Sequence, residues 1–183
     1  MGVQFGCRGF TLVELLVVIA LIAVLQLIAV PAFVNISNSM RLTAAVNSLF
    51  SSLLLARNEA IKRNSRAVVC KSLSGETCIR TGGWDQGWIV FHDANNNAAL
   101  DAGEAVLSRQ PAFAQSIRFT GNDPVESYVS YVSTGGAQYT SGAFQAGTLT
   151  VCPQSATRVD ARQIVINSAG RPRTVRTMVE NCA

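Results

Sequence analysis

The hydropathy pattern is dominated by an apolar run over residues 10–30, close to the start of the chain. A helix of this length is about 31 Å long, enough to cross the hydrocarbon layer of a membrane. Pro31 follows the run directly and is expected to loosen or kink the helix, because proline has no amide hydrogen to donate. The pattern therefore predicts a membrane-spanning helix over residues 10–30.

Beyond Pro31 the apolar residues return at steps of three and four, which is typical of an amphipathic helix that packs on a core. The stripe contains Leu42, Val46, Leu49, Leu53 and Ala60. The pattern predicts a second helical segment over residues 31–64, whose apolar stripe packs against whatever follows it.

After Asn64 the pattern changes to short runs of β-forming residues between clusters of Gly, Asn, Asp and Ser. These runs predict a head, residues 65–183, that is built of strands and lies against the helix. The predicted strands are residues 67–73, 87–92, 105–108, 116–120, 128–133, 148–152, 163–167 and 172–178. The expected fold class is α+β, with a long N-terminal helix packed on an all-β C-terminal head.

The formal charge of +4 is distributed unevenly along the chain. Residues 57–80 hold six basic and two acidic side chains, whereas residues 84–126 hold two basic and six acidic ones. Residues 158–180 carry five arginines against two acids. The positive charge is therefore local, and it can form a patch on the folded protein.

The apolar run contains one carboxylate, that of Glu14, and an unpaired charge inside a bilayer is costly. A partner arises if the chain is cut between Gly9 and Phe10, because the cut creates an α-amino group four residues before Glu14. A plain membrane anchor and an ordinary secretory signal are the alternatives, but neither explains the carboxylate. Cleavage at this position would therefore supply the positive partner that Glu14 needs.

The segment RGFTLVELLVVIALIAVLQLIAVP resembles the class III signal of type IV prepilins and type II secretion pseudopilins, through Gly9, Phe10, Thr11, Leu12, Glu14 and Pro31. The resemblance implies that residues 1–9 are a leader, which a prepilin peptidase removes before Phe10 is methylated. It implies that Glu14 meets the N-terminal amine of a neighbouring pilin during assembly. Before assembly the protein would span the inner membrane once, with its head in the periplasm. After assembly it would be part of a pilus or pseudopilus filament.

A second stretch, GGWDQGWIVFHDANNNAALDAGEAVL, resembles the signature of the GspH/FimT group of pseudopilins and minor pilins. The resembling residues are Trp84, Gly87, Trp88, Phe91, Asp93, Asn95, Asp101, Gly103 and Glu104. Together with the leader and the long helix, this resemblance spans nearly the whole chain. It implies the pilin shape, a long helix that enters a globular β head.

The same stretch also fits a calcium-loop template at positions 1, 3, 5, 7, 9 and 12. Those positions hold Asp93, Asn95, Asn97, Ala99, Asp101 and Glu104. Ala98, however, stands where the sharp turn of that template requires glycine, and Asn and Asp are ordinary residues of polar turns. A structural turn is therefore preferred over a metal site, and His92 beside it is expected to be an ordinary strand residue.

Cysteine usage fits an exported head. Cys7 lies in the predicted leader, and an even number of cysteines, suited to an oxidising compartment, follows it. We favour the pair Cys70 and Cys78, which closes a local loop, and the pair Cys152 and Cys182, which ties down the C-terminus. A zinc site is disfavoured, because C-x-x-C spacings are missing and the chain has a single histidine.

The sequence SAGRPRTVR near the C-terminus predicts two strands joined by a turn, in which Gly170 adopts a positive φ. Pro172 cannot donate a ladder hydrogen bond, so its strand begins at, or follows, a sheet edge. The strand period of two predicts that Arg171 and Arg173 point to one face and Arg176 to the other.

The GRPR sequence is similar to the Gly-Arg-x-Arg pattern with which FimT-type minor pilins bind DNA during natural transformation. The resemblance implies a site for double-stranded DNA formed by Gly170, Arg171, Arg173 and Arg176, with Arg158 and Arg162 as candidates to widen it. Arginine forks would grip the phosphates without reading the bases. The alternative is that these arginines are edge charges that discourage aggregation.

No catalytic set, metal cluster or cofactor loop is recognisable in the sequence. The chain is therefore interpreted as a minor pilin or pseudopilin, not an enzyme, and no cofactor is expected. Two functions follow. The protein is a structural subunit that primes or caps a type IV pilus or a type II secretion pseudopilus, or it also captures DNA.

Overall fold

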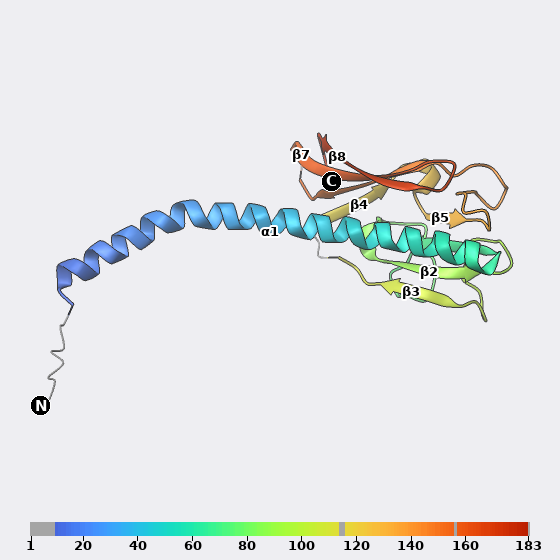
Figure 1. Ribbon diagram of the computed structural model, residues 1–183, viewed down its shortest axis with the longest axis horizontal. Coiled ribbons are helices and arrows are strands. Elements are labelled where there is room, and N and C mark those ends of the chain that lie inside the picture. The colour runs from blue at the N-terminus through green and yellow to red at the C-terminus, as the bar shows by residue number, and fades with distance from the viewer. Residues whose placement is uncertain (1–9, 114–115, 156, 183) are drawn as a thin grey trace, which may run out of the picture. The chain divides into compact units, whose positions relative to one another are not determined.

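The structure, a computed structural model, describes residues 10–113, 116–155 and 157–182, and for residues 28, 31 and 35 it describes the backbone alone. Within these residues one long helix, α1 (Leu12–Arg63), precedes eight strands. Figure 1 shows this helix and the strands that follow it. The strands are β1 (Arg66–Lys71), β2 (Trp88–Asp93), β3 (Val106–Gln110), β4 (Ile117–Gly121), β5 (Tyr128–Tyr131), β6 (Gly147–Pro153), β7 (Val159–Ile166) and β8 (Pro172–Val179). Short 3-10 helices, η1 (Trp84–Gln86) and η2 (Asp123–Val125), lie between strands. The expected α+β class is confirmed.

Helix α1 is one long helix, as predicted, and it passes through Pro31 without ending. The helix ends next to Asn64, as predicted, and Asn64 has a φ of 48°. The amides of Asn64 and Ser65 donate to the carbonyls of Ile61 and Ala60, both at 3.2 Å, which is the Schellman pattern of a helix end.

The strands form two antiparallel four-stranded sheets, with orders β3-β2-β1-β5 and β4-β6-β7-β8. Strand β8 is an edge strand, as Pro172 predicted. All eight predicted strands are found among the described residues, but β7 starts at Val159 instead of residue 163. The extra residues pair with the end of β8, where Val159 lies opposite Val179. Pairing with a neighbouring strand thus extends a segment whose own composition is only weakly β-forming.

The chain divides into two compact units, residues 1–40 and residues 41–183. We call the second unit the head. Every buried side chain among the described residues belongs to it, beginning with Leu42. The head thus contains the C-terminal half of α1 and a complete core of its own, whereas the sequence pattern placed its start at residue 65. A head without the preceding residues is therefore expected to fold.

The apolar stripe of α1 packs against both sheets. The five predicted stripe residues are all buried, and Leu49, Leu53 and Ala60 have no exposed surface. They belong to one core cluster with residues from β1, β2 and β5 of the first sheet and from β4, β6 and β7 of the second. The indole Nε1 of Trp88 donates a hydrogen bond of 2.9 Å to Ser52 Oγ, which joins β2 to the helix. The predicted contact between helix and head is confirmed.

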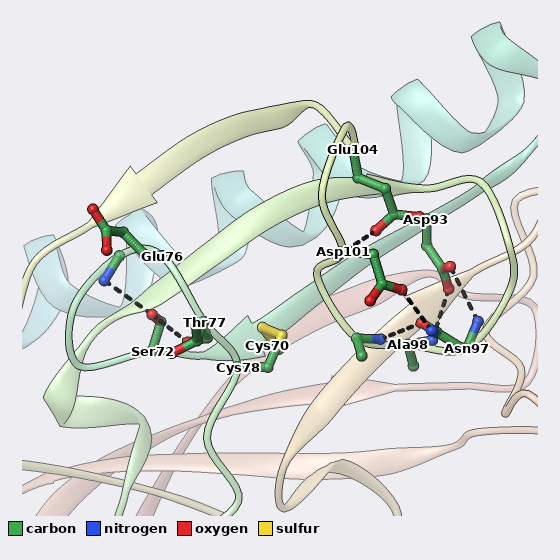
Figure 2. Close-up of a disulfide and its surroundings, with 12 residues drawn as sticks. Cys70, Ser72, Glu76, Thr77, Cys78, Asp93, Asn97, Ala98, Asp101 and Glu104 are labelled. Atoms are coloured by element: carbon green, nitrogen blue, oxygen red, sulfur yellow. Dashed lines mark hydrogen bonds between the residues drawn. A yellow bond between two sulfur atoms is a disulfide. The ribbon is translucent and has the colours of Figure 1, made fainter.

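Both favoured disulfides, Cys70–Cys78 and Cys152–Cys182, are present. Figure 2 shows the first, which lies on the face of β1 and β2 that is turned away from the main core. There it joins a second cluster of buried residues that includes Ile89 and Phe91. The disulfide-closed loop and the loop before β3 cover this cluster, so β1 is buried on both faces.

We expect removal of the Cys152–Cys182 disulfide to destabilise the head more than removal of the Cys70–Cys78 disulfide. The sequence separations are 30 and 8, and the longer loop loses more unfolded-state entropy on closure. The chain-entropy relation gives losses of about 3–4 and about 2–3 kcal/mol in the free energy of unfolding. We call residues 38–183 the head fragment. Urea unfolding of this fragment measures the free energy of unfolding of the Cys70→Ala/Cys78→Ala variant and of the Cys152→Ala/Cys182→Ala variant. The reverse order would contradict the entropic account.

Candidate functional site

Glu14 lies at the start of α1 and caps it. The backbone N–H of Glu14 donates to Thr11 Oγ1 at 3.2 Å, and the N–H of Thr11 donates to the Glu14 carboxylate at 3.4 Å. This is a capping box, in which two residues satisfy each other's free amides at a helix N-terminus. The interpretation of Glu14 from its charge missed this capping role. The sequence TLVE has threonine and glutamate three residues apart, which is the signature of a capping box. The cap places the carboxylate one helical turn from Phe10.

The N-terminal half of α1 presents an apolar surface on all sides. Its described large apolar side chains, from Phe10 to Ile36, are between 44% and 85% exposed. Within the described residues α1 is the one helix long and apolar enough to cross a membrane. Gly9 and the rest of the predicted leader lie outside the described residues. A surface of this kind requires lipid or other helices around it.

The turn between β7 and β8 is built around Gly170. Its φ is 71°, and its N–H donates to the carbonyl of Asn167 at 2.9 Å. The N–H of Arg171 donates to Asn167 Oδ1 at 3.0 Å. A Cβ at position 170 would lie 2.2 Å from the carbonyl oxygen of Gly135. The turn therefore requires glycine both for its φ, as predicted, and for its close approach to a neighbouring loop.

Arg171 lines a cavity of about 460 Å³, which we call the turn pocket. Arg57 of α1 lines the same pocket, and its Nε donates to the carbonyl of Gly135 at 2.9 Å. The other lining residues are Thr134, Gly136, Gln138, Phe144, Asn167, Ser168 and Ala169. Among the described residues that line the pocket, two are arginines and none is Asp or Glu. Sequence reasoning missed Arg57, because the tertiary fold alone brings α1 beside this turn.

The arginines of β8 lie on opposite faces of the sheet, as predicted. Arg173 is exposed and lies opposite Val165, whereas Arg176 lies opposite Arg162 and lines another cavity with it. Arg171 precedes the first residue of β8, so the strand period does not place its side chain. That Arg171 and Arg173 share one face stays a prediction.

The other arginines do not widen this surface. Arg176 and Arg162 face the side of α1, away from Arg173. Arg158 lies at the far end of the β7–β8 hairpin, where its Nε is 3.7 Å from a carboxylate oxygen of Glu180. The basic surface near the turn is therefore limited to Arg171, Arg173 and the previously unrecognised Arg57.

The loop that fits the calcium template is held by N–H donors of its own backbone and side chains, as Figure 2 shows. Asp93 is buried, and its carboxylate accepts the N–H groups of Asn97 at 3.1 Å and of Ala98 at 2.9 Å. Ala98 adopts a φ of 58°, so alanine takes the conformation that normally favours glycine. These contacts are those of a structural turn.

The remaining carboxylates of this loop are engaged in the same way. Asp101 Oδ2 accepts the side-chain amides of Asn95 at 2.8 Å and Asn97 at 2.7 Å, and these bonds hold the pKa of the Asp101 carboxyl below its ordinary value. Glu104 accepts the N–H groups of Ala94 and Asp101. Among the described residues, no group of three His, Cys, Asp or Glu side chains is placed to hold a metal ion.

Comparison with known families and proteins agrees with this architecture. The family described as type II transport protein GspH matches residues 45–170, and the prokaryotic N-terminal methylation motif matches residues 5–30. The pilin-like protein PilA1 of Thermus thermophilus is 35% identical over 97 residues, which cover 53% of this chain and 55% of that protein. The match thus spans about half the length of this curated relative.

Two solved structures share the fold. The type IV minor pilin FimU of Pseudomonas aeruginosa has a TM-score of 0.56 at 18% identity, with 81% of this chain and 99% of that chain covered. The minor pseudopilin EpsH of the Vibrio cholerae type 2 secretion system has a TM-score of 0.50 at 12% identity, with 74% and 96% covered. At such identities the likeness is one of fold.

We expect Gly170→Ala to destabilise the head fragment by at least about 1 kcal/mol more than Gly142→Ala. Gly142 also has a positive φ, 86°, but no atom lies within 4 Å of a Cβ added there. The Gly142→Ala variant therefore reports only the cost of placing alanine at a positive φ, about 1–2 kcal/mol. At Gly170 the turn must also move away from Gly135. Urea unfolding measures both variants, and equal losses would show that the close approach carries no energy.

Proposed function

Because the chain belongs to the GspH family of type II transport proteins, we propose that it is a minor pilin or pseudopilin that assembles into a filament through α1. Before assembly the protein is anchored in the inner membrane by residues 10–30, with its head in the periplasm. The match to the N-terminal methylation motif and the exposed apolar surface of α1 support this role. The two disulfides suit an oxidising compartment.

Assembly begins, in this proposal, when a prepilin peptidase cuts between Gly9 and Phe10. The cut leaves a positive amine on Phe10. The carboxylate of Glu14, held at the helix start by the cap with Thr11, then pairs with the N-terminal amine of a neighbouring pilin. An unpaired carboxylate in the bilayer is costly, so the pair favours docking of the incoming subunit.

We expect the Glu14→Gln variant to remain in the membrane fraction. Its incorporation into filaments should fall roughly ten-fold or more, because the negative charge that pairs with the amine of the neighbouring pilin is lost. Glutamine can still accept the capping hydrogen bond, so the helix start is preserved. Thr11→Ala is the matched control, since it removes the cap and keeps the charge. Immunoblots of sheared filaments and membranes measure incorporation.

Mass spectrometry of the processed protein tests the same proposal at the cleavage site. The expected mature chain starts at Phe10. Normal filament incorporation of Glu14→Gln, or a mature start at another residue, would reject the role proposed for the N-terminal segment.

We propose in addition that the head binds double-stranded DNA without sequence preference, for DNA uptake in natural transformation. The observation that carries this proposal is the turn pocket, where Arg57 and Arg171 from separate elements line one cavity that has no carboxylate in its wall. Arg173 extends the basic surface along the exposed edge strand. Arginine forks suit the phosphate backbone, and contact with phosphates alone carries no base information.

Fluorescence anisotropy of a labelled duplex tests DNA binding by the head fragment. We expect binding at low salt, with an affinity that falls steeply as salt rises. The Arg171→Ala/Arg173→Ala double variant should lose most of this binding and reduce the slope of log K against log salt by about 2, because two phosphate contacts disappear. Arg57→Gln should also weaken binding of the duplex.

The control variant for this experiment is Arg158→Ala, which removes another exposed arginine, one that already faces Glu180. It should bind DNA as the wild type does. Equal binding by the double variant and the wild type, or no binding by the wild-type head, would reject the DNA proposal. The protein would then be a structural tip or priming subunit of a type IV pilus or type II secretion pseudopilus.

A further inference from the structure

Two arginines of the β7–β8 hairpin lie directly opposite each other. Arg162 of β7 pairs with Arg176 of β8 in the antiparallel register. Their side chains therefore share the face of the sheet that also carries the buried Ile164. Like charges at directly opposed positions of a sheet destabilise it. Arg176 is exposed and Arg162 is half-buried, so a counter-charge beside them would relieve this repulsion.

Among the described residues, neither Arg162 nor Arg176 forms an ion pair of 4.0 Å or less with a carboxylate. Asp160, two residues before Arg162 on the same face, does not line the cavity. The Nε of Arg162 is buried without a hydrogen-bond partner among the described residues. A buried N–H group without a partner is costly, which points to an acceptor that binds there.

The two guanidinium groups line a cavity of about 250 Å³ between the hairpin and α1. Its other lining residues are Thr43, Val46, Asn47, Thr174 and Val175. Hydroxyl and amide side chains thus join the arginines in its wall, and none of the described lining residues is Asp or Glu. The cavity has the volume for a small oxyanion and donors on more than one side.

We propose that Arg162 and Arg176 form a phosphate-binding site. A phosphate group places oxygens in a tetrahedral arrangement, so that each arginine fork can take a different oxygen, and its negative charge lies between the two guanidinium groups. The two oxygens of a carboxylate lie in one plane and match a single arginine fork. The site is separate from the turn pocket, and it does not depend on the DNA contacts proposed for Arg171 and Arg173.

The Nε–H signals of Arg162 and Arg176 in NMR spectra of the head fragment report binding directly. Titration with sodium phosphate at constant ionic strength should shift both signals saturably, as a single site does. Arg162→Gln and Arg176→Gln should each weaken the affinity roughly ten-fold or more, since each removes charge-assisted hydrogen bonds. Arg173→Gln, which changes the opposite face of β8, should leave the affinity unchanged.

The phosphate can come from the free ion or from a DNA backbone, and addition of a DNA duplex distinguishes these sources. If duplex shifts the Arg162 Nε–H signal and inorganic phosphate reverses the shift, the backbone enters the site. If duplex leaves that signal unchanged, free phosphate is the ligand. Either result supports the site, and neither depends on whether Arg171 and Arg173 bind DNA.

Three results would overturn the proposal. They are the absence of a saturable shift with phosphate, an unchanged phosphate affinity in Arg162→Gln and Arg176→Gln, and an equal affinity for acetate. Circular dichroism of the variants confirms that the hairpin is folded, which makes a loss of binding attributable to the missing guanidinium group.

Discussion

The head depends on the burial of one face of α1 against two sheets. Leu49 and Leu53 have no exposed surface, and small residues such as Ala56 and Ala60 on the same stripe let strands approach the helix closely. The same helix carries exposed apolar side chains on every side before residue 41. One helix therefore serves two environments, a protein core at one end and lipid or neighbouring helices at the other. The proposed filament assembly and the folding of the head thus depend on the same helix.

Buried cations hold the irregular parts of the head to its first strand. Lys71 is fully buried, its Nζ donates to the carbonyls of Arg80 and Gly82, and burial lowers the pKa of its amine. Arg66 at the other end of β1 donates to the carbonyls of Gln138 and Tyr139. Because Gln138 lines the turn pocket, a buried charge in the first sheet positions one wall of the proposed DNA surface. These loops lie outside the strands of both sheets, and the charge-assisted hydrogen bonds from Lys71 and Arg66 hold them in place.

The β7–β8 hairpin separates its arginines by face, and the proposed roles follow that separation. Arg173 is exposed on the outer face, where it also discourages pairing with another sheet edge. Arg162 and Arg176 line a cavity together with residues of α1, and the proposed phosphate site uses both arginines and the Arg162 Nε–H, which has no partner among the described residues. The turn that joins the strands brings Arg171 beside Arg57, because glycine at position 170 allows contact with the loop at Gly135.

The sequence by itself determined the elements with strong local signals. The apolar run, the stripe from Leu42 to Ala60, the eight strands and the edge position of Pro172 all follow from periodicity or turn residues, which act over short distances. The cysteines after the leader allowed three pairings, and the structure contains the favoured one. The tertiary structure alone decided which distant side chains meet. It placed Arg57 beside Arg171, set Arg162 opposite Arg176, and began β7 at Val159, because such contacts depend on strand register and helix docking that no local pattern encodes.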